Sequence, residues 1–97
     1  MSELRFEWDP RKAAANLAKH GVSFSEAETA FSDEAGFVLD DPAHSADEVR
    51  FVLLGLSAEL RVLVVIHCLR EAGQVIRLIS ARRANRLERD LYRVRNS

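Results

Sequence analysis

Three runs rich in Val, Ile and Leu follow one another closely, and they constrain the fold more than any other feature of the sequence. They cover residues 48–57, 61–69 and 74–81. Runs of this length and composition predict β-strands. The connections, Ala58-Glu59 and residues 70–73, are short enough to be hairpin loops, so we expect neighbouring strands to pair antiparallel.

A helix is predicted before these strands, over residues 10–20. Asp9 supplies an N-cap side chain, and Pro10 suits the first position of a helix. The residues that follow are rich in alanine, a strong helix former. Gly21 can adopt the left-handed conformation that ends a helix.

A second short helix is predicted almost at once. Ser23 and Glu26 have the spacing of a capping box, and the helix should end near Ser32. Residues 6–8 form a short alternating stretch, and residues 36–40 form a short apolar piece. The stretch over residues 6–8 is expected to form a short strand that precedes the two helices.

The last predicted element is a helix that runs from a capping pair, Asn85 and Glu88, to about Arg95. It has an apolar stripe on one side and arginines on the other. The stripe is Leu87, Leu91 and Val94, and the opposite side carries Arg86, Arg89 and Arg93. The arginine side is expected to be solvated or to face a partner.

These elements predict an α+β fold in a single domain over residues 1–97, because a chain this short supports one hydrophobic core. We expect two N-terminal helices, an antiparallel sheet of about four strands, and a C-terminal helix. The helices should cover one face of the sheet. The other face is then left for the last helix, a partner or a ligand.

The charges divide unevenly along the chain. Residues 1–60 hold five basic side chains against twelve acids, whereas residues 61–97 hold nine arginines against three acids. An arginine-rich face is the electrostatic footprint of a polyanion site. The alternative is that the two halves neutralise each other across the fold.

Composition excludes several classes of protein. The sequence has no apolar run long enough to span a bilayer and no secretory signal, and its single cysteine, Cys68, cannot form an internal disulfide. We therefore expect a protein of the reducing cytoplasm that makes no membrane contact.

Metal and nucleotide chemistry find little support. One cysteine and three scattered histidines do not form a zinc site. The acids Asp40, Asp41, Asp47 and Glu48 lack the repeated spacing of a Mg²⁺ site, and no glycine-rich phosphate loop is present. We expect no metal and no cofactor.

Two residues of the strand over 61–69 carry reactive groups. Neighbours on a strand point to opposite faces, so His67 cannot activate the thiol of Cys68. Cys68 is expected in the core. His67 is either a hydrogen-bonded, half-buried residue or a proton-transfer group.

The arginines indicate a functional site more clearly than His67 and Cys68 do. Arg50, Arg61, Arg70 and Arg77 bracket or interrupt the strands. An unpaired charge at Arg77 would be costly, so Arg77 must meet an acid or line an open site. If these arginines converge with Arg82 and Arg83, they form a cluster that can hold a phosphodiester and stabilise its transition state without a metal. Whether His67 shares a face with Arg77 or with Ser80 depends on the hairpin loop near Glu71.

The chain resembles the BrnT toxins, the ribonuclease half of bacterial type II toxin–antitoxin pairs. The resemblance runs from Phe6 to Tyr92. It rests on Phe6-Glu7-Trp8-Asp9-Pro10 with Lys12 and Asn16, on Lys19-His20-Gly21-Val22 with Phe24, on Glu48 and Arg50, on Val64 to His67 with Arg70, and on Ile79-Ser80-Ala81-Arg82 continuing to Glu88 and Tyr92. Cys68 stands where the family usually has a hydroxyl residue, and Asn85 where threonine is usual.

The resemblance implies a RelE-like ribonuclease fold, metal-independent cleavage of RNA and inhibition of translation. It also implies neutralisation by a cognate BrnA-like ribbon-helix-helix antitoxin, with operator DNA contacted only through that antitoxin and the operon repressed by the complex. On this basis Arg50, Arg70, Arg77 and Arg82 are expected to hold phosphate and charge, and His67 or Tyr92 to handle protons. Lys19, His20, Arg83 and Arg86 are expected to guide RNA or antitoxin.

Two alternatives stay open at this stage. The chain can be a non-catalytic module that binds nucleic acid or protein with the same basic face, or a degenerate toxin that acts as a regulator of its operon. Salt dependence of binding does not separate them from an enzyme, since each of them predicts it.

Overall fold

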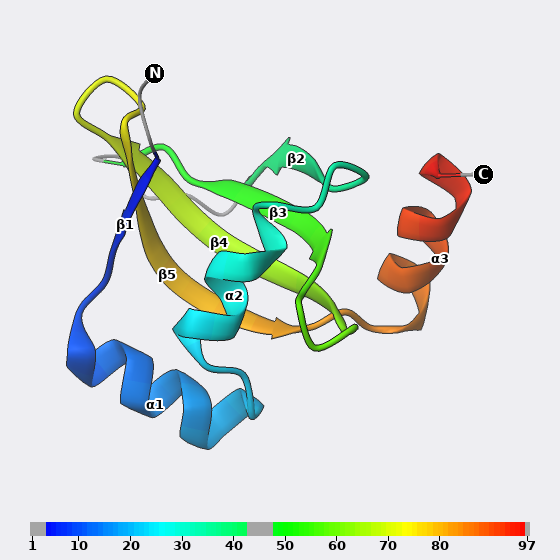
Figure 1. Ribbon diagram of the computed structural model, residues 1–97, viewed down its shortest axis with the longest axis horizontal. Helices are drawn as coiled ribbons and strands as arrows, with labels where there is room; N and C mark the ends of the chain where they lie inside the picture. The colour runs from blue at the N-terminus through cyan, green and yellow to red at the C-terminus, as the bar shows by residue number, and fades with distance from the viewer. Residues whose placement is uncertain (1–3, 43–47, 97) are drawn as a thin grey trace.

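The computed structural model describes residues 4–42 and 48–96 and contains three helices and one five-stranded sheet (Figure 1). In chain order the elements are β1 (Arg5–Glu7), α1 (Pro10–His20), α2 (Phe24–Ala30), β2 (Phe37–Asp40), β3 (Phe51–Leu56), β4 (Val62–Arg70), β5 (Val75–Arg83) and α3 (Arg86–Arg95). The α+β class, the three hairpin-connected strands and the three helices are confirmed. In the described part of the chain, no helix has the length and apolar character needed to cross a membrane.

The sheet has the strand order β1-β5-β4-β3-β2. The prediction of about four antiparallel strands is wrong in two respects, because the sheet has five strands and β1 pairs with β5 in parallel. β1 has only three residues and its partner lies at the far end of the chain. No local pattern in so short a segment indicates which strand it will join.

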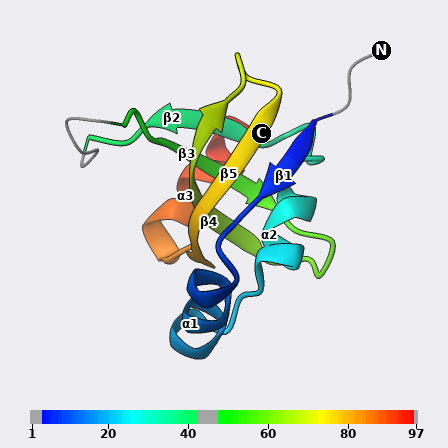
Figure 2. The same cartoon turned by 90° about the vertical axis from the view of Figure 1, so that its left-hand side faces the viewer.

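Helices cover both faces of the sheet, but unequally. α1 and α2 pack on one face, and α3 lies on the other side at one end of the strands (Figure 2). The main core lies under α2, where Phe24 and Ala27 meet Leu63, Val65 and Leu78. A small second cluster forms under α3, so much of the second sheet face stays open, as the sequence predicted.

The caps of α1 are those expected from the sequence. The Asp9 side chain accepts a hydrogen bond of 2.8 Å from the amide of Arg11, and Pro10 is the first helical residue. At the other end Gly21 has a φ of 69° and donates to the carbonyl of Leu17. This left-handed residue turns the chain directly toward α2.

Asn16 ties α1 to β5 from within the core. Its Nδ2 donates to the carbonyls of Val22 and Ala81 at 2.9 and 2.8 Å, and its Oδ1 accepts from the amide of Ala81 at 3.0 Å. β1 pairs only with the first residues of β5, so a side chain of α1 takes the place of a strand partner farther along. These contacts fix the position of α1 against the edge of the sheet.

Glu26 joins α2 to the β3–β4 hairpin. The sequence predicted a capping box, but only the Ser23 half is present, with Oγ accepting from the amide of Glu26. The Glu26 carboxylate turns instead to the hydroxyl of Ser57 at 2.7 Å and to the guanidinium of Arg61. The bond from Arg61 holds the pKa of Glu26 below its usual range, although burial opposes the charge.

Replacing Asn16 with alanine should destabilise the fold by about 2–4 kcal/mol, because it leaves the buried backbone groups of Val22 and Ala81 without partners. Urea unfolding of the two proteins measures this difference. The exposed Lys12→Ala on the same helix is the control and should change stability by less than about 0.5 kcal/mol. Equal midpoints for Asn16→Ala and the control would contradict the role of Asn16.

Candidate active site and nucleic-acid interface

A bulge in the β4–β5 ladder decides which side chains share a face. His67 lies opposite Leu78, whereas the next pair is Ile66 with Ser80, so Ile79 is left between them without a β4 partner. His67 therefore shares a face with neither Arg77 nor Ser80, which answers the question that the sequence left open. Arg77 pairs with Cys68 on the open face, and His67 points into the main core.

Five charged residues gather at one end of this open face, and we call them the arginine–glutamate cluster: Glu7, Glu48, Arg50, Arg70 and Arg77. The Arg77 guanidinium donates to the Glu7 carboxylate at 2.7 Å. The Nε of Arg70 lies 3.6 Å from Oε2 of Glu7, and its Nη2 lies 3.6 Å from Oε2 of Glu48. Arg50 lies 3.4 Å from Glu48. Strand geometry produces the grouping, since Glu7 and Arg77 are neighbours across β1 and β5.

The cluster carries an excess of positive charge. It holds three guanidinium groups against two carboxylates, and all five side chains are partly exposed. Apart from the short Arg77–Glu7 bond, the ion pairs are 3.4–3.6 Å long. Solvated pairs of this length contribute little stability, so a phosphate can displace the carboxylates from the arginines.

A pocket of about 540 Å³ opens beside the cluster. Its lining residues are Glu48, Val49, Phe51, Cys68, Leu69 and Arg70. The pocket brings one carboxylate and one guanidinium next to apolar and aromatic surface. Such a combination suits a nucleotide, whose phosphate is charged and whose base is flat and apolar on its faces.

Arg82 does not join this cluster. It lies five residues beyond Arg77 on β5, which is about 15 Å along a strand. Its guanidinium makes two bonds of 2.8 Å to Glu88, the residue whose carboxylate also completes the cap of α3. The bonds from Arg82 hold the pKa of Glu88 below its usual range. Arg77 and Arg82 share a face, but each guanidinium is bound to a different glutamate.

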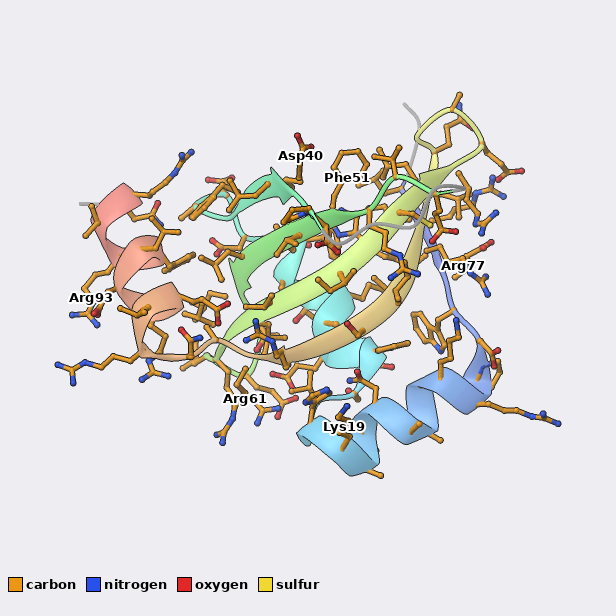
Figure 3. All side chains as sticks on the ribbon, turned by 180° about the vertical axis from the view of Figure 1, so that it is seen from behind. Lys19, Asp40, Phe51, Arg61, Arg77 and Arg93 are labelled. Atoms are coloured by element: carbon orange, nitrogen blue, oxygen red, sulfur yellow. The ribbon has the colours of Figure 1, made fainter. Side chains whose placement is uncertain are left out.

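A second cationic feature, the basic cleft, lies at the end of the sheet. It has a volume of about 650 Å³, and its polar lining residues are Lys19, His20, Arg61, Arg82, Arg83 and Arg89. Figure 3 shows Arg61 from the β3–β4 hairpin and Lys19 from the end of α1 on this side of the molecule, and Arg77 far from both. Three of the four residues predicted to guide RNA or antitoxin line the cleft, and Arg86, the fourth, lies on α3.

His67 lies apart from every predicted arginine. Its side chain is 3% exposed, its ring stands edge-on to Phe31 at 4.9 Å, and its Nδ1 is 3.2 Å from the carbonyl of Val65. Burial lowers the pKa of His67 and keeps the ring neutral, although the contact with Val65 opposes the shift. The structure thus favours the hydrogen-bonded alternative over the proton-transfer one.

Tyr92 is a residue of α3 and packs against the small second cluster of the core, away from the arginine–glutamate cluster. Its hydroxyl donates to Asp33 at 2.5 Å. Burial and this carboxylate raise the pKa of Tyr92 to about 12. Burial opposes the charge of Asp33, but the bonds from Tyr92 and from the amides of Leu56 and Ala35 outweigh it and hold its pKa below the usual range. Tyr92 therefore attaches α3 to the sheet.

Cys68 is buried, as predicted, but it lies beneath the arginine–glutamate cluster. Burial and the nearby charge of Glu48 raise the pKa of its thiol, so the thiolate is disfavoured. Among the residues that the structure describes, no group of three or more His, Cys, Asp and Glu side chains is placed to hold a metal ion. Asp47, one of the acids weighed for Mg²⁺, lies outside the described residues.

The sequence prediction gave the carboxylates no role in the site. Glu48 was weighed as a metal ligand and was quoted with Arg50 for the family resemblance. It stands two residues before Arg50, the spacing that places two side chains on one face of an extended chain. That spacing was the available signal. Glu7 carried no signal, because its contact with Arg77 exists only through the pairing of β1 with β5.

The chain is a small α+β protein that carries arginines on an open sheet face and a basic cleft at the end of the sheet, a charge distribution typical of proteins that bind polyanions. The comparison with family models is more specific. The family described as "Ribonuclease toxin, BrnT, of type II toxin-antitoxin system" matches residues 8–88, so the chain belongs to the BrnT family of ribonuclease toxins. Membership of a type II system implies a cognate antitoxin as its partner.

The solved structures give the same answer. The crystal structure of the Brucella abortus ribonuclease toxin BrnT is similar, with 26% sequence identity and a TM-score of 0.59. The match covers 89% of this chain and 100% of that chain. A search of the curated proteins finds no match.

The single tyrosine of the chain provides a direct test of the contact between α3 and the sheet. Tyr92 should titrate at about 12 in the folded protein and near 10 after unfolding in urea, as followed by tyrosinate absorbance. Because the folded pKa is the higher one, this contribution to stability is complete below pH 10 and is lost as the pH rises through 12. Asp33→Asn should lower the folded value, and a folded value of 10 in the native chain would contradict the contact.

Proposed function

We propose that this BrnT-family chain is an endoribonuclease that cleaves RNA without a metal ion, at the arginine–glutamate cluster. The observation that carries the proposal is the grouping of Arg50, Arg70 and Arg77 with two carboxylates on the open face of the sheet. Metal-independent cleavage of RNA needs an acceptor for a proton and cations that stabilise the developing charge on phosphorus. The cluster offers both.

In the proposed reaction the RNA 2′-hydroxyl attacks the adjacent phosphorus. A carboxylate takes the hydroxyl proton, the 2′-oxygen–phosphorus bond forms, and the bond from phosphorus to the 5′-oxygen breaks. The departing 5′-oxygen takes up a proton from water. The products are a 2′,3′-cyclic phosphate and a free 5′-hydroxyl, and the three guanidinium groups stabilise the phosphorane between them.

Glu48 is the proton acceptor in this proposal. It lines the pocket beside the cluster, and its contacts with Arg50 and Arg70 are long. Glu7 is bound more tightly, by the 2.7 Å bond from Arg77, and so acts as the residue that positions that arginine. His67 and Tyr92 are the residues that the resemblance implied for proton handling. His67 lies in the core, and the hydroxyl of Tyr92 on α3 is bound to Asp33, so the geometry favours Glu48 over both.

The basic cleft binds the flanking RNA backbone in this proposal. Arg82 holds a phosphate some distance from the reacting one, and Lys19, His20 and Arg83 hold others along the cleft. Arginine suits this role because its planar fork matches a phosphate at two points. The placement of Arg82 and Arg77 on one face supports a single RNA path across both features.

The wider biology follows from the toxin family. We propose that the chain has a RelE-like ribonuclease fold, that it acts in the cytoplasm and inhibits translation, and that a ribbon-helix-helix antitoxin neutralises it. The operon is then repressed by the complex, with the antitoxin contacting operator DNA. The net excess of arginine in residues 61–97 supports contacts with nucleic acid or with an acidic partner.

One observation favours the non-catalytic alternative. Arg61, Arg70 and Arg77 each pair with a glutamate from the first half of the chain, and Arg82 pairs with Glu88. To this extent the two halves of the chain neutralise each other. A protein that only binds nucleic acid does not require arginines that are free to stabilise a transition state. Cleavage of labelled RNA in EDTA separates the two functions.

Arg77→Ala should lower the rate of RNA cleavage in EDTA by about 100-fold or more, because it removes a cation from the reacting phosphate. Glu48→Gln should cause a loss of similar size through the proton step, and it keeps the shape of the side chain. Gel analysis of end-labelled RNA with detection of a 2′,3′-cyclic phosphate measures both. The exposed Arg11→Ala is the matched control and should retain the full rate.

Intact RNA with the unaltered protein in EDTA would overturn the enzymatic proposal, and retained RNA binding would then support the non-catalytic module. If His67→Gln abolishes cleavage in a folded protein while Glu48→Gln does not, the proton acceptor is wrongly assigned. Circular dichroism of each variant shows that the fold is kept.

The basic cleft predicts the salt dependence of RNA binding. Lys19→Ala and Arg83→Ala should each reduce the slope of log K against log salt by about 0.7, the value for one phosphate contact with a single strand. Fluorescence anisotropy with a labelled 2′-O-methyl RNA measures binding without cleavage. Lys12→Ala on the exposed side of α1 should leave the slope unchanged. An equal slope for all three variants would show that Lys19 and Arg83 do not contact the RNA backbone.

A further inference from the structure

The apolar stripe of α3 faces solvent. The sequence places Leu87, Leu91 and Val94 on one side of this helix and predicts that the opposite, arginine side is solvated or faces a partner. The structure nevertheless leaves 79%, 44% and 69% of these three apolar residues exposed. No residue of α3, all of which the structure describes, is buried. A soluble domain gains nothing by displaying large aliphatic side chains at regular helical spacing, so the stripe indicates a partner.

Other side chains hold α3 on the sheet. On one flank Tyr92 reaches Asp33, Asn96 donates to the carbonyl of Ala35 at 3.2 Å, and Arg89 donates to the carbonyl of Ala84 at 2.8 Å. These three contacts lie at the end of the sheet. They fix the helix through polar groups and leave its aliphatic side chains available.

The opposite flank of α3 reaches the open face. Glu88 binds Arg82, and the guanidinium of Arg95 lies 4.3 Å from the centre of the Phe37 ring on β2. Successive residues of an α-helix are rotated by about 100° around its axis. Viewed down the axis and starting from Tyr92, Glu88 and Arg95 come first, and Leu91 and Leu87 come next, at roughly 100–140° from Tyr92. The stripe therefore borders the open face rather than the far side of the molecule.

The open sheet beside α3 continues this apolar character. Ile66 on β4, Val52 on β3 and Leu39 on β2 form one row across the strands, as their register shows. All three are at least partly exposed. A partner that covers the stripe and this row would also reach the arginine–glutamate cluster, which occupies the next part of the same face.

We infer that the stripe of α3 and the adjoining open face are the docking surface for an acidic, amphipathic segment of the cognate antitoxin. Aliphatic side chains bury apolar protein surface but offer nothing on which an RNA base can stack, so the occupant of the stripe is a protein. Its charge follows from the surroundings. Arg86 and Arg93 lie on α3 beyond the stripe, and Arg82 and the cluster lie on the sheet.

This placement suggests how the toxin is silenced. A segment seated on Leu87 and Leu91 and continuing over the row of Ile66 covers the face on which Arg77 and Glu48 lie. Its carboxylates take the place of RNA phosphates at the arginines. The inference uses the antitoxin implied by the family and rests on the proposed function only for the claim that binding blocks cleavage.

The test compares Leu87→Ser/Leu91→Ser with Leu17→Ser, a leucine on α1 that is 51% exposed and lies on another face of the molecule. The probe is the product of the reading frame adjacent to the toxin gene, purified and titrated by calorimetry. The double variant should bind at least about 100-fold more weakly, since it loses two anchors, while Leu17→Ser binds like the unaltered chain. Arg86→Ala/Arg93→Ala should weaken binding mainly at low salt.

Equal affinity of the double variant and the unaltered chain would overturn the inference, as would failure of the unaltered chain to bind the probe. A dimer of the unaltered chain that becomes monomeric in the double variant would also overturn it, by assigning the stripe to a second copy. RNA cleavage by the double variant should be normal and resistant to the antitoxin. If the unaltered chain does not cleave RNA, the proposed function is rejected, whereas the result on antitoxin binding still stands.

Discussion

The register of β4 and β5 is the constraint on which the rest of the structure depends. Without the extra residue at Ile79, strict alternation would place Arg82 on the core face and Ala81 on the open one. The bulge reverses this, so the small Ala81 packs beneath α1, where Asn16 binds its backbone. Arg82 and Arg77 consequently share the open face. One unpaired residue thus serves the core and the candidate site together.

The second organising feature is the meeting of the two oppositely charged halves of the chain. Glu26 binds Arg61 where α2 meets the β3–β4 hairpin, and Glu7 binds Arg77 at the edge of the sheet. The first glutamate is buried and its pair holds the fold together. The second is partly exposed, so water and anions compete for its arginine. The buried arginine–glutamate pair stabilises the fold, whereas the partly exposed pair leaves its arginine accessible to an anion.

α3 connects these features to the partner of the toxin. Its polar flank is fixed to the sheet, one of its arginines lines the basic cleft, and its aliphatic stripe borders the open face. The helix therefore contributes to the basic cleft and also borders the open face of the sheet. A protein that recognises the stripe can also cover the arginine–glutamate cluster, because both belong to the same side of the sheet.

The sequence by itself determined the local elements and the type of chemistry. Caps at Asp9 and Asn85, the short hairpin connections and the arginine-rich second half are encoded by neighbouring residues, and the resemblance to BrnT toxins was carried by short motifs. Only the tertiary structure decided the parallel pairing of β1, the bulge at Ile79, the carboxylate partners of the arginines and the outward direction of the α3 stripe. The physical reason is distance along the chain. Contacts such as Glu7 with Arg77 depend on the register between remote strands, and a shift of one residue in that register exchanges the faces on which side chains lie.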